Sequence, residues 1–153
     1  MSTPVIESIA VDIAAVIAAI TTDNGFNQDL TAQRPRRQDF SDVTPEDLLC
    51  LIVQNNASAE GGAVGCATWK ETFEICVFVI DSDDATDSID TRRNAVAADI
   101  TKKLNEDITR GGYAYDTQII DRAMFNDGEG LSGVVVTVEV SYRTLLNDPY
   151  TKT

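Results

Sequence analysis

The chain has 153 residues, of which 25 are acidic, 12 are basic and none is histidine, and its formal net charge is −13. This length favours one domain, and the acid excess argues against general binding to nucleic acids or to anionic membranes. The lack of histidine excludes Ser-His-Asp and Cys-His catalysis and every metal site that contains histidine.

The first part of the chain predicts one helix and one strand. Apolar side chains recur at helical spacing over 4–22, before the sequence DNG supplies a stop. Pro35 places the extended segment 28–37 at a sheet edge or in a loop, because proline lacks the N–H that a central strand needs. Residues 48–54 are apolar on both alternating faces and predict a central strand covered on both sides. The Asn, Ser, Ala and Gly of 55–65 predict a flexible loop.

The second part of the chain predicts three further strands and a second helix. Residues 67–80 predict a strand that begins half exposed and ends buried, and 87–108 predict a helix. A weaker strand over 113–125 and a turn-rich connection over 126–133 follow. The strict alternation of 134–144 predicts a half-buried antiparallel strand.

Together these elements predict one α+β domain over 1–153. We expect a two-layer sandwich, in which two helices cover a mainly antiparallel four-stranded sheet, with extended loops and arms. Leu145 and Leu146 precede a turn-forming Asp-Pro, so we expect 145–153 to form a C-terminal contact arm. The alternative is that Leu145 and Tyr150 pack back on their own sheet.

The cysteines indicate free thiols. Cys50, Cys66 and Cys76 are an odd number without a CxxC pair, so they predict neither a disulfide framework nor a zinc site. The chain has no basic leader of the signal-peptide kind and no apolar run of about 20 residues. We therefore expect a reducing compartment and no membrane partner.

No pattern of residues predicts a catalytic, metal or nucleotide site. Asp81 and Asp83 start like a calcium loop, but Ala85, Thr86 and Arg92 occupy positions that such a loop gives to ligands or glycine. The segment 126–130, NDGEG, is more typical of a turn than of a cation site. Neither the P-loop motif nor a GxGxxG after a strand occurs. We expect no cofactor and no enzyme activity.

A cluster of arginines stands out in this acidic chain. Arg34, Arg36 and Arg37 lie within the four residues RPRR. One interpretation is a solvated edge whose arginines pair with nearby acids. The other is a positive contact patch for an acidic neighbour or a polyanion, since the guanidinium binds carboxylates and phosphates at two points.

The order of elements resembles the tail terminator (tail completion) family of long-tailed bacteriophages. The resemblance rests on a leading apolar helix, the arginine-bearing segment, the strand TWKETFEICVFV and the ending VEVSYRTLLNDPY. It covers most of the chain in order and length. It implies a structural virion protein that forms a hexameric ring, caps the tail tube, ends tail growth and offers a joining surface to the head.

The resemblance also implies partners and contact residues. The partners are other copies of the chain, the tail tube protein, a head-side connector or neck protein, and genomic DNA that passes through the lumen without sequence-specific binding. The protein would be assembled in the host cytoplasm and lie at the head–tail junction of the virion. The expected contact residues are Arg34, Arg36, Arg37, Arg143, Leu145, Leu146, Asp148, Pro149 and Tyr150.

Three alternatives remain open from the sequence. The first is a head-completion or neck adaptor protein of the same junction. The second is an acidic binding module for a basic partner, such as a nucleic-acid mimic. The third is a histidine-free enzyme that uses carboxylates.

Overall fold

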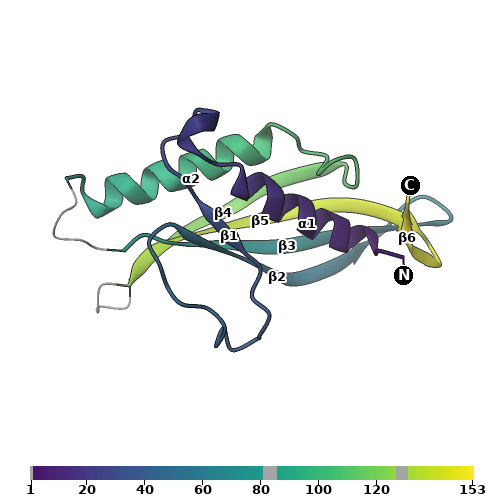
Figure 1. Ribbon diagram of the computed structural model, residues 1–153. Coiled ribbons are helices and arrows are strands. Elements are labelled where there is room, and N and C mark those ends of the chain that lie inside the picture. Colours follow the sequence, from purple (N-terminus) through teal and green to yellow (C-terminus); the bar gives the residue numbers. More distant parts are fainter. Residues whose placement is uncertain (1, 81–85, 127–130) are drawn as a thin grey trace.

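The backbone is organised around one curled sheet, with both helices on one side of it (Figure 1). The computed structural model describes residues 2–80, 86–126 and 131–153. In chain order, the elements are α1 (Val5–Ala18), the 3-10 turn η1 (Thr22–Asn24), β1 (Thr31–Gln33), β2 (Leu49–Glu60), β3 (Cys66–Phe78), α2 (Ile89–Asn105), β4 (Asp116–Asn126), β5 (Ser132–Leu145) and β6 (Asp148–Lys152).

The predicted sandwich with a four-stranded sheet is wrong. Strands make up 41% of the chain, and six of them form a mixed sheet that curls into a half-barrel. Its order is β1-β2-β3-β5-β4, and β6 pairs with the end of β5. Strand β1 runs parallel to β2, whereas the other neighbours are antiparallel. The two extra strands come from the edge segment and from the C-terminal end.

The loop predicted over 55–65 is also wrong for its first half, because β2 continues to Glu60. The long strand β3 pairs with this polar stretch, with Ser58 opposite Lys70 and Glu60 opposite Thr68. The ammonium of Lys70 lies 3.1 Å from the Glu60 carboxylate. Residues of low strand propensity extend here because a neighbouring strand supplies the backbone bonds and cross-strand contacts.

The main core lies between the helices and the inner face of the sheet. Ile9, Ile13 and Ile17 of α1 are fully buried, which confirms the apolar spacing read from the sequence. The inner face of β5 is buried from Val134 to Tyr142, as its alternation predicted. Helix α1 ends at Ala18, and α2 is shorter than predicted, with Ser88 capping it by accepting a hydrogen bond from the Thr91 amide.

A buried arginine ties α1 to the turn after α2. Arg110 is fully buried, and its guanidinium lies 3.3 Å from the carboxylate of Asp12. It also donates to the carbonyl oxygens of Leu104, at 2.6 Å, and Asp107. Burial lowers the pKa of Arg110 and raises the pKa of Asp12, because both charged forms lose hydration.

The outer face of the sheet is covered by a loop instead of a helical layer. Leu49, Leu51 and Phe78 form a small second cluster there, against which Val43 packs. The connection 34–48, which we call the arginine loop, crosses this face between β1 and β2 and projects below the sheet in Figure 1. The strand predicted over 48–54 is thus covered on both sides only where this loop passes. In the described residues no helix is long and apolar enough to span a membrane.

Candidate interaction surfaces

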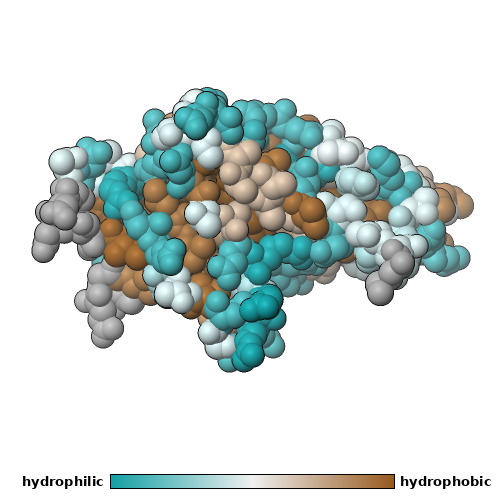
Figure 2. Space-filling view, in the orientation of Figure 1, coloured by the Kyte–Doolittle hydropathy of each residue, from teal (hydrophilic) through white to brown (hydrophobic). Residues whose placement is uncertain are grey.

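The arginine loop is anchored at its C-terminal end. The amide of Leu48 donates to the Phe78 carbonyl at 2.7 Å, and the Asp47 carboxylate accepts from the amide of Ile80 at 3.0 Å. The guanidinium of Arg92, from α2, lies 2.6 Å from the same carboxylate. The projecting part of the loop is strongly hydrophilic in Figure 2. The loop is therefore fixed at its C-terminal end and presents a polar tip to solvent.

Arg34 binds its own subunit. Its guanidinium forms two hydrogen bonds to the Glu7 carboxylate, of 2.7 and 3.1 Å, and so ties the loop to the first turn of α1. This interaction lowers the pKa of Glu7 and raises the pKa of Arg34. The predicted solvated-edge interpretation therefore describes this arginine.

Arg36 and Arg37 are more open. The Arg36 side chain is 87% exposed, and its Nε lies 3.7 Å from the Asp42 carboxylate, which also accepts from the Arg36 amide at 2.9 Å. Arg37 is exposed, and its guanidinium has no ion-pair partner within residues 2–80, 86–126 and 131–153. These two side chains give the loop an available positive charge.

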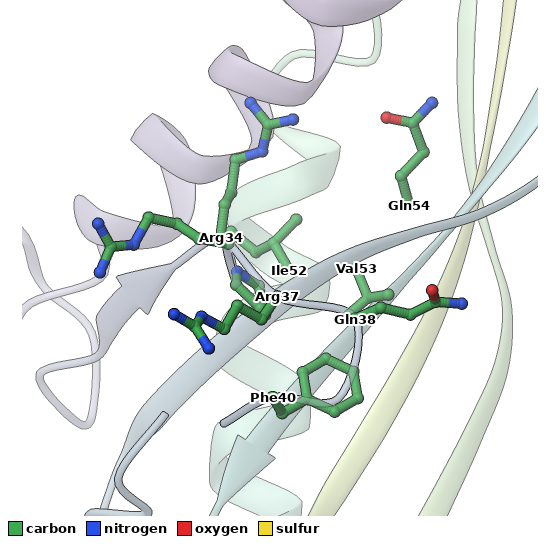
Figure 3. Close-up of a pocket in the computed structure, with 9 residues that line it drawn as sticks. Arg34, Arg37, Gln38, Phe40, Ile52, Val53 and Gln54 are labelled. Carbon is green, nitrogen blue, oxygen red and sulfur yellow. The ribbon is translucent and has the colours of Figure 1, made fainter. Parts of the chain in front are cut away.

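Two adjoining cavities lie beside the loop. The first holds about 310 Å³ and brings the three arginines next to the β2 residues 52–54 and the ring of Phe40 (Figure 3). The second holds about 330 Å³ and is mostly apolar. Phe40 and Val53 line both cavities, so we call the two cavities together the loop groove. The apolar part is lined by Phe40, Val43, Pro45, Leu51, Val53, Glu74, Cys76, Phe78 and Val135.

Sequence reasoning missed this groove. Leu51 and Val53 were assigned to a strand covered on both sides, and Phe40 was given no role. The available signal was the alternation of β3, which turns apolar on its outer face at Cys76 and Phe78. An outer face that changes from polar to apolar needs a cover, and the arginine loop supplies part of it through Val43, together with Phe125 and Leu131. Burial raises the pKa of Cys76 to about 11, so its thiol is not a ready nucleophile.

The predicted contact arm folds back as a hairpin strand. Residues 145–152, which we call the C-terminal hairpin, turn after β5 and place Lys152 opposite Thr144. The Asp148 carboxylate accepts from the Tyr150 amide at 3.0 Å and from the Thr151 hydroxyl at 2.6 Å, which lowers the pKa of Asp148. These bonds lie within β6, whose antiparallel pairing with β5 folds the segment back instead of letting it extend away from the domain.

The hairpin nevertheless exposes apolar side chains. Leu145, Leu146 and Tyr150 are 42%, 61% and 51% exposed. Leu145, Leu146 and Asp148 line a shallow cavity with Gly65, whose carbonyl accepts from the Leu146 amide at 2.9 Å. Whether these side chains contact another chain stays a prediction.

Pro149 and Arg143 have local partners. Pro149 lines a cavity of about 200 Å³ on the α1 side, with Ile6, Trp69 and Tyr142. The Arg143 guanidinium lies 4.8 Å from the centre of the Tyr115 ring, a cation–π distance. These two predicted contact residues therefore join neither the loop groove nor the exposed leucines.

The two surfaces lie at opposite ends of the outer face. Strand β3 places Cys76, in the groove, opposite Leu51, and Cys66 opposite Leu145 of the hairpin. The ten residue steps from Cys66 to Cys76 span about 33 Å at strand rise. The structure thus places the predicted arginines of the loop and the exposed leucines of the hairpin in two separate groups along β3, while Arg143 and Pro149 join neither.

The predicted absence of a calcium site remains a prediction, because Asp81 and Asp83 lie outside the described residues, as do 127–130. Among the residues that the structure describes, no group of three or more Cys, Asp or Glu side chains is placed to hold a metal ion. The chain matches no protein-family model and no curated protein sequence.

Proposed function

We propose that this chain is a structural virion protein that forms a ring at the end of a phage tail tube, as a tail terminator. The observation that supports the proposal is a pair of different surfaces on one subunit, the loop groove and the exposed apolar side chains of the C-terminal hairpin, which lie far apart along β3. A subunit in a ring meets two neighbours, and a repeated head-to-tail contact needs two different surfaces. The order of elements that resembles the terminator family also supports it.

The charge distribution fits this role. The formal net charge of −13 favours solubility before assembly and repels DNA, which in a tail must slide instead of sticking. Arg36 and Arg37 supply local positive charge at one end, where an acidic neighbour would approach.

The test is assembly of the purified chain. Light scattering at two concentrations, followed by electron microscopy, should give a closed ring of defined mass with a central opening. Adding the protein to tail tubes of the same phage should shorten newly polymerised tubes and leave density at one end. Binding to the head connector but not to tubes would favour the neck adaptor instead. A monomer that binds neither tubes nor heads would contradict the proposal.

A further inference from the structure

We propose that the C-terminal hairpin of one copy of this chain docks into the loop groove of a second copy. This contact would join neighbouring subunits of the proposed ring. It rests on the proposed function only because the occupant of the groove is taken to be a second copy of the chain. The contact places Leu145 and Leu146 against the apolar part of the groove and Asp148 toward Arg36 and Arg37.

The hairpin has the chemistry of an insert. Leu145 and Leu146 are exposed at the turn between β5 and β6, which is held by the antiparallel pairing of these strands and by the bond that the Leu146 amide donates to the Gly65 carbonyl at 2.9 Å. A rigid turn loses little conformational entropy on binding, so its apolar contacts contribute more to affinity than those of a flexible tail. The Asp148 carboxylate follows the leucines after one residue, Asn147, and the hydrogen bond from Thr151 lowers its pKa, so it is ionised at neutral pH.

The groove has the matching chemistry. Its apolar part lies between Phe40 and the outer face of β2 and β3, and its other part carries the exposed guanidinium groups of Arg37 and of Arg36, whose Nε lies 3.7 Å from the Asp42 carboxylate. An occupant should therefore present apolar side chains and, within a few residues, a carboxylate. The order Leu-Leu-Asn-Asp at 145–148 has this pattern. A guanidinium that meets a carboxylate at the edge of an apolar contact fixes the orientation of the pair.

The two surfaces cannot meet within one chain. They lie on the same sheet about 33 Å apart along β3, and the strand between them is paired on both sides with β2 and β5. The contact is therefore between copies and uses different surfaces on each, so it repeats until a ring closes or a filament grows.

Three variants test the contact. The hairpin variant is Leu145→Ser/Leu146→Ser, which leaves Asp148 and its turn intact. The groove variant is Arg36→Ser/Arg37→Ser/Phe40→Asn, with asparagine chosen because residue 40 has φ of 57°. The matched control is Ile120→Ser/Arg122→Ser on β4, since Ile120 is 50% exposed and Arg122 is exposed.

Sedimentation should show that the hairpin and groove variants each weaken self-association at least about tenfold, while the control assembles as the unchanged chain does. An equimolar mixture of the two variants has one intact contact per pair. It should form dimers and no larger species. Melting curves check that each variant is folded.

A second measurement does not depend on loss of binding. A photoreactive amino acid at position 146 of an otherwise unchanged chain should form a cross-link to another copy, in a peptide that contains Phe40 or Val53. Cross-links elsewhere, a mixture that stays monomeric, or variants that assemble normally would overturn the inference. If one of these results is obtained while rings still form, the inference fails but the proposed function stands. If hairpin and groove pair but only filaments result, the inference stands and the terminator ring fails.

Discussion

Arg34 should differ from Arg36 in what it does for the fold, although the two are separated by one residue. The change Arg34→Gln removes two hydrogen bonds to Glu7, whereas Arg36→Gln removes only a long contact from a side chain that is 87% exposed. The Arg34 and Glu7 side chains are 35% and 43% exposed, so solvent screens their attraction. Because the guanidinium bonds the carboxylate at two points, we expect the pair to stabilise the fold by about 1 kcal/mol, near the upper end of the range for exposed ion pairs.

For a chain of this length, 1 kcal/mol corresponds to a fall in Tm of about 2–4 °C. We expect Arg34→Gln to lower Tm by about 3 °C at pH 7 and low salt, with a smaller fall at high salt. Arg36→Gln, the matched control, should stay within about 0.5 kcal/mol of the unchanged chain. Calorimetry or circular dichroism melts measure both.

The pKa of Glu7 determines how the stabilising effect of the Arg34–Glu7 pair changes with pH. Bonding to Arg34 lowers the pKa of Glu7 in the folded state below its ordinary value of 4.5. Its contribution to the free energy of unfolding is therefore full above pH 4.5 and is lost as the pH falls through the lowered folded pKa. The difference between the Arg34→Gln variant and the unchanged chain should shrink over that acid range. Equal melting temperatures for the two arginine variants, or no coupling in a cycle with Glu7→Gln, would refute the reasoning.

Three further outcomes are expected. Gly133→Ala should prevent stable folding, measured by circular dichroism, because the added Cβ would lie 1.9 Å from the carbonyl oxygen of Val77; normal melting would contradict this. Asp12→Ala should cost about 3 kcal/mol in urea unfolding, because it leaves the fully buried Arg110 without its carboxylate, and a cost below about 1 kcal/mol would show that the carbonyls suffice. Removing 145–153 should leave the far-ultraviolet spectrum nearly unchanged yet abolish assembly in light scattering, and assembly that persists would exclude the C-terminal hairpin as a contact.

The core could be predicted from the sequence because its periodicity is strong. Three isoleucines of α1, Ile9, Ile13 and Ile17, lie inside as their spacing indicates, and so do the alternating valines of β5, Val134, Val136, Val138 and Val140. The edge position of the segment around Pro35 also follows from the sequence, and β1 lies at the sheet edge as expected.

The number of strands could not be predicted in the same way. Residues 55–60 carry no strand signal of their own, and they extend because β3 is long enough to pair with them. Strand β6 pairs with the end of β5, and the Asp148 side chain bonds residues two and three positions further along β6. Both additions depend on partners distant in sequence or on side-chain turns, which periodicity does not report.

The candidate surfaces were predicted in part. Composition identifies the arginines and the exposed end of the chain, but it does not distinguish Arg34, held by Glu7, from the open Arg36 and Arg37. The groove depends on a loop crossing the outer face, which no local pattern in 34–48 indicates. The structure therefore separates the predicted arginine cluster into Arg34, which binds its own subunit, and Arg36 and Arg37, which are exposed to a partner.

Two strands of the sheet, β2 and β4, carry an irregularity that bears on solubility. Strand β2 has an extra residue at Asn55, and β4 has one at Ile120, so the ladder of each strand is interrupted near its middle. Beyond Leu51, no described strand pairs with the free side of β2, and none pairs with the free side of β4. Long flat edges of this kind recruit strands from other molecules and aggregate, and a bulge interrupts the ladder that recruitment needs. A concentrated pool of these chains would thus be kept from stacking indiscriminately through their backbones.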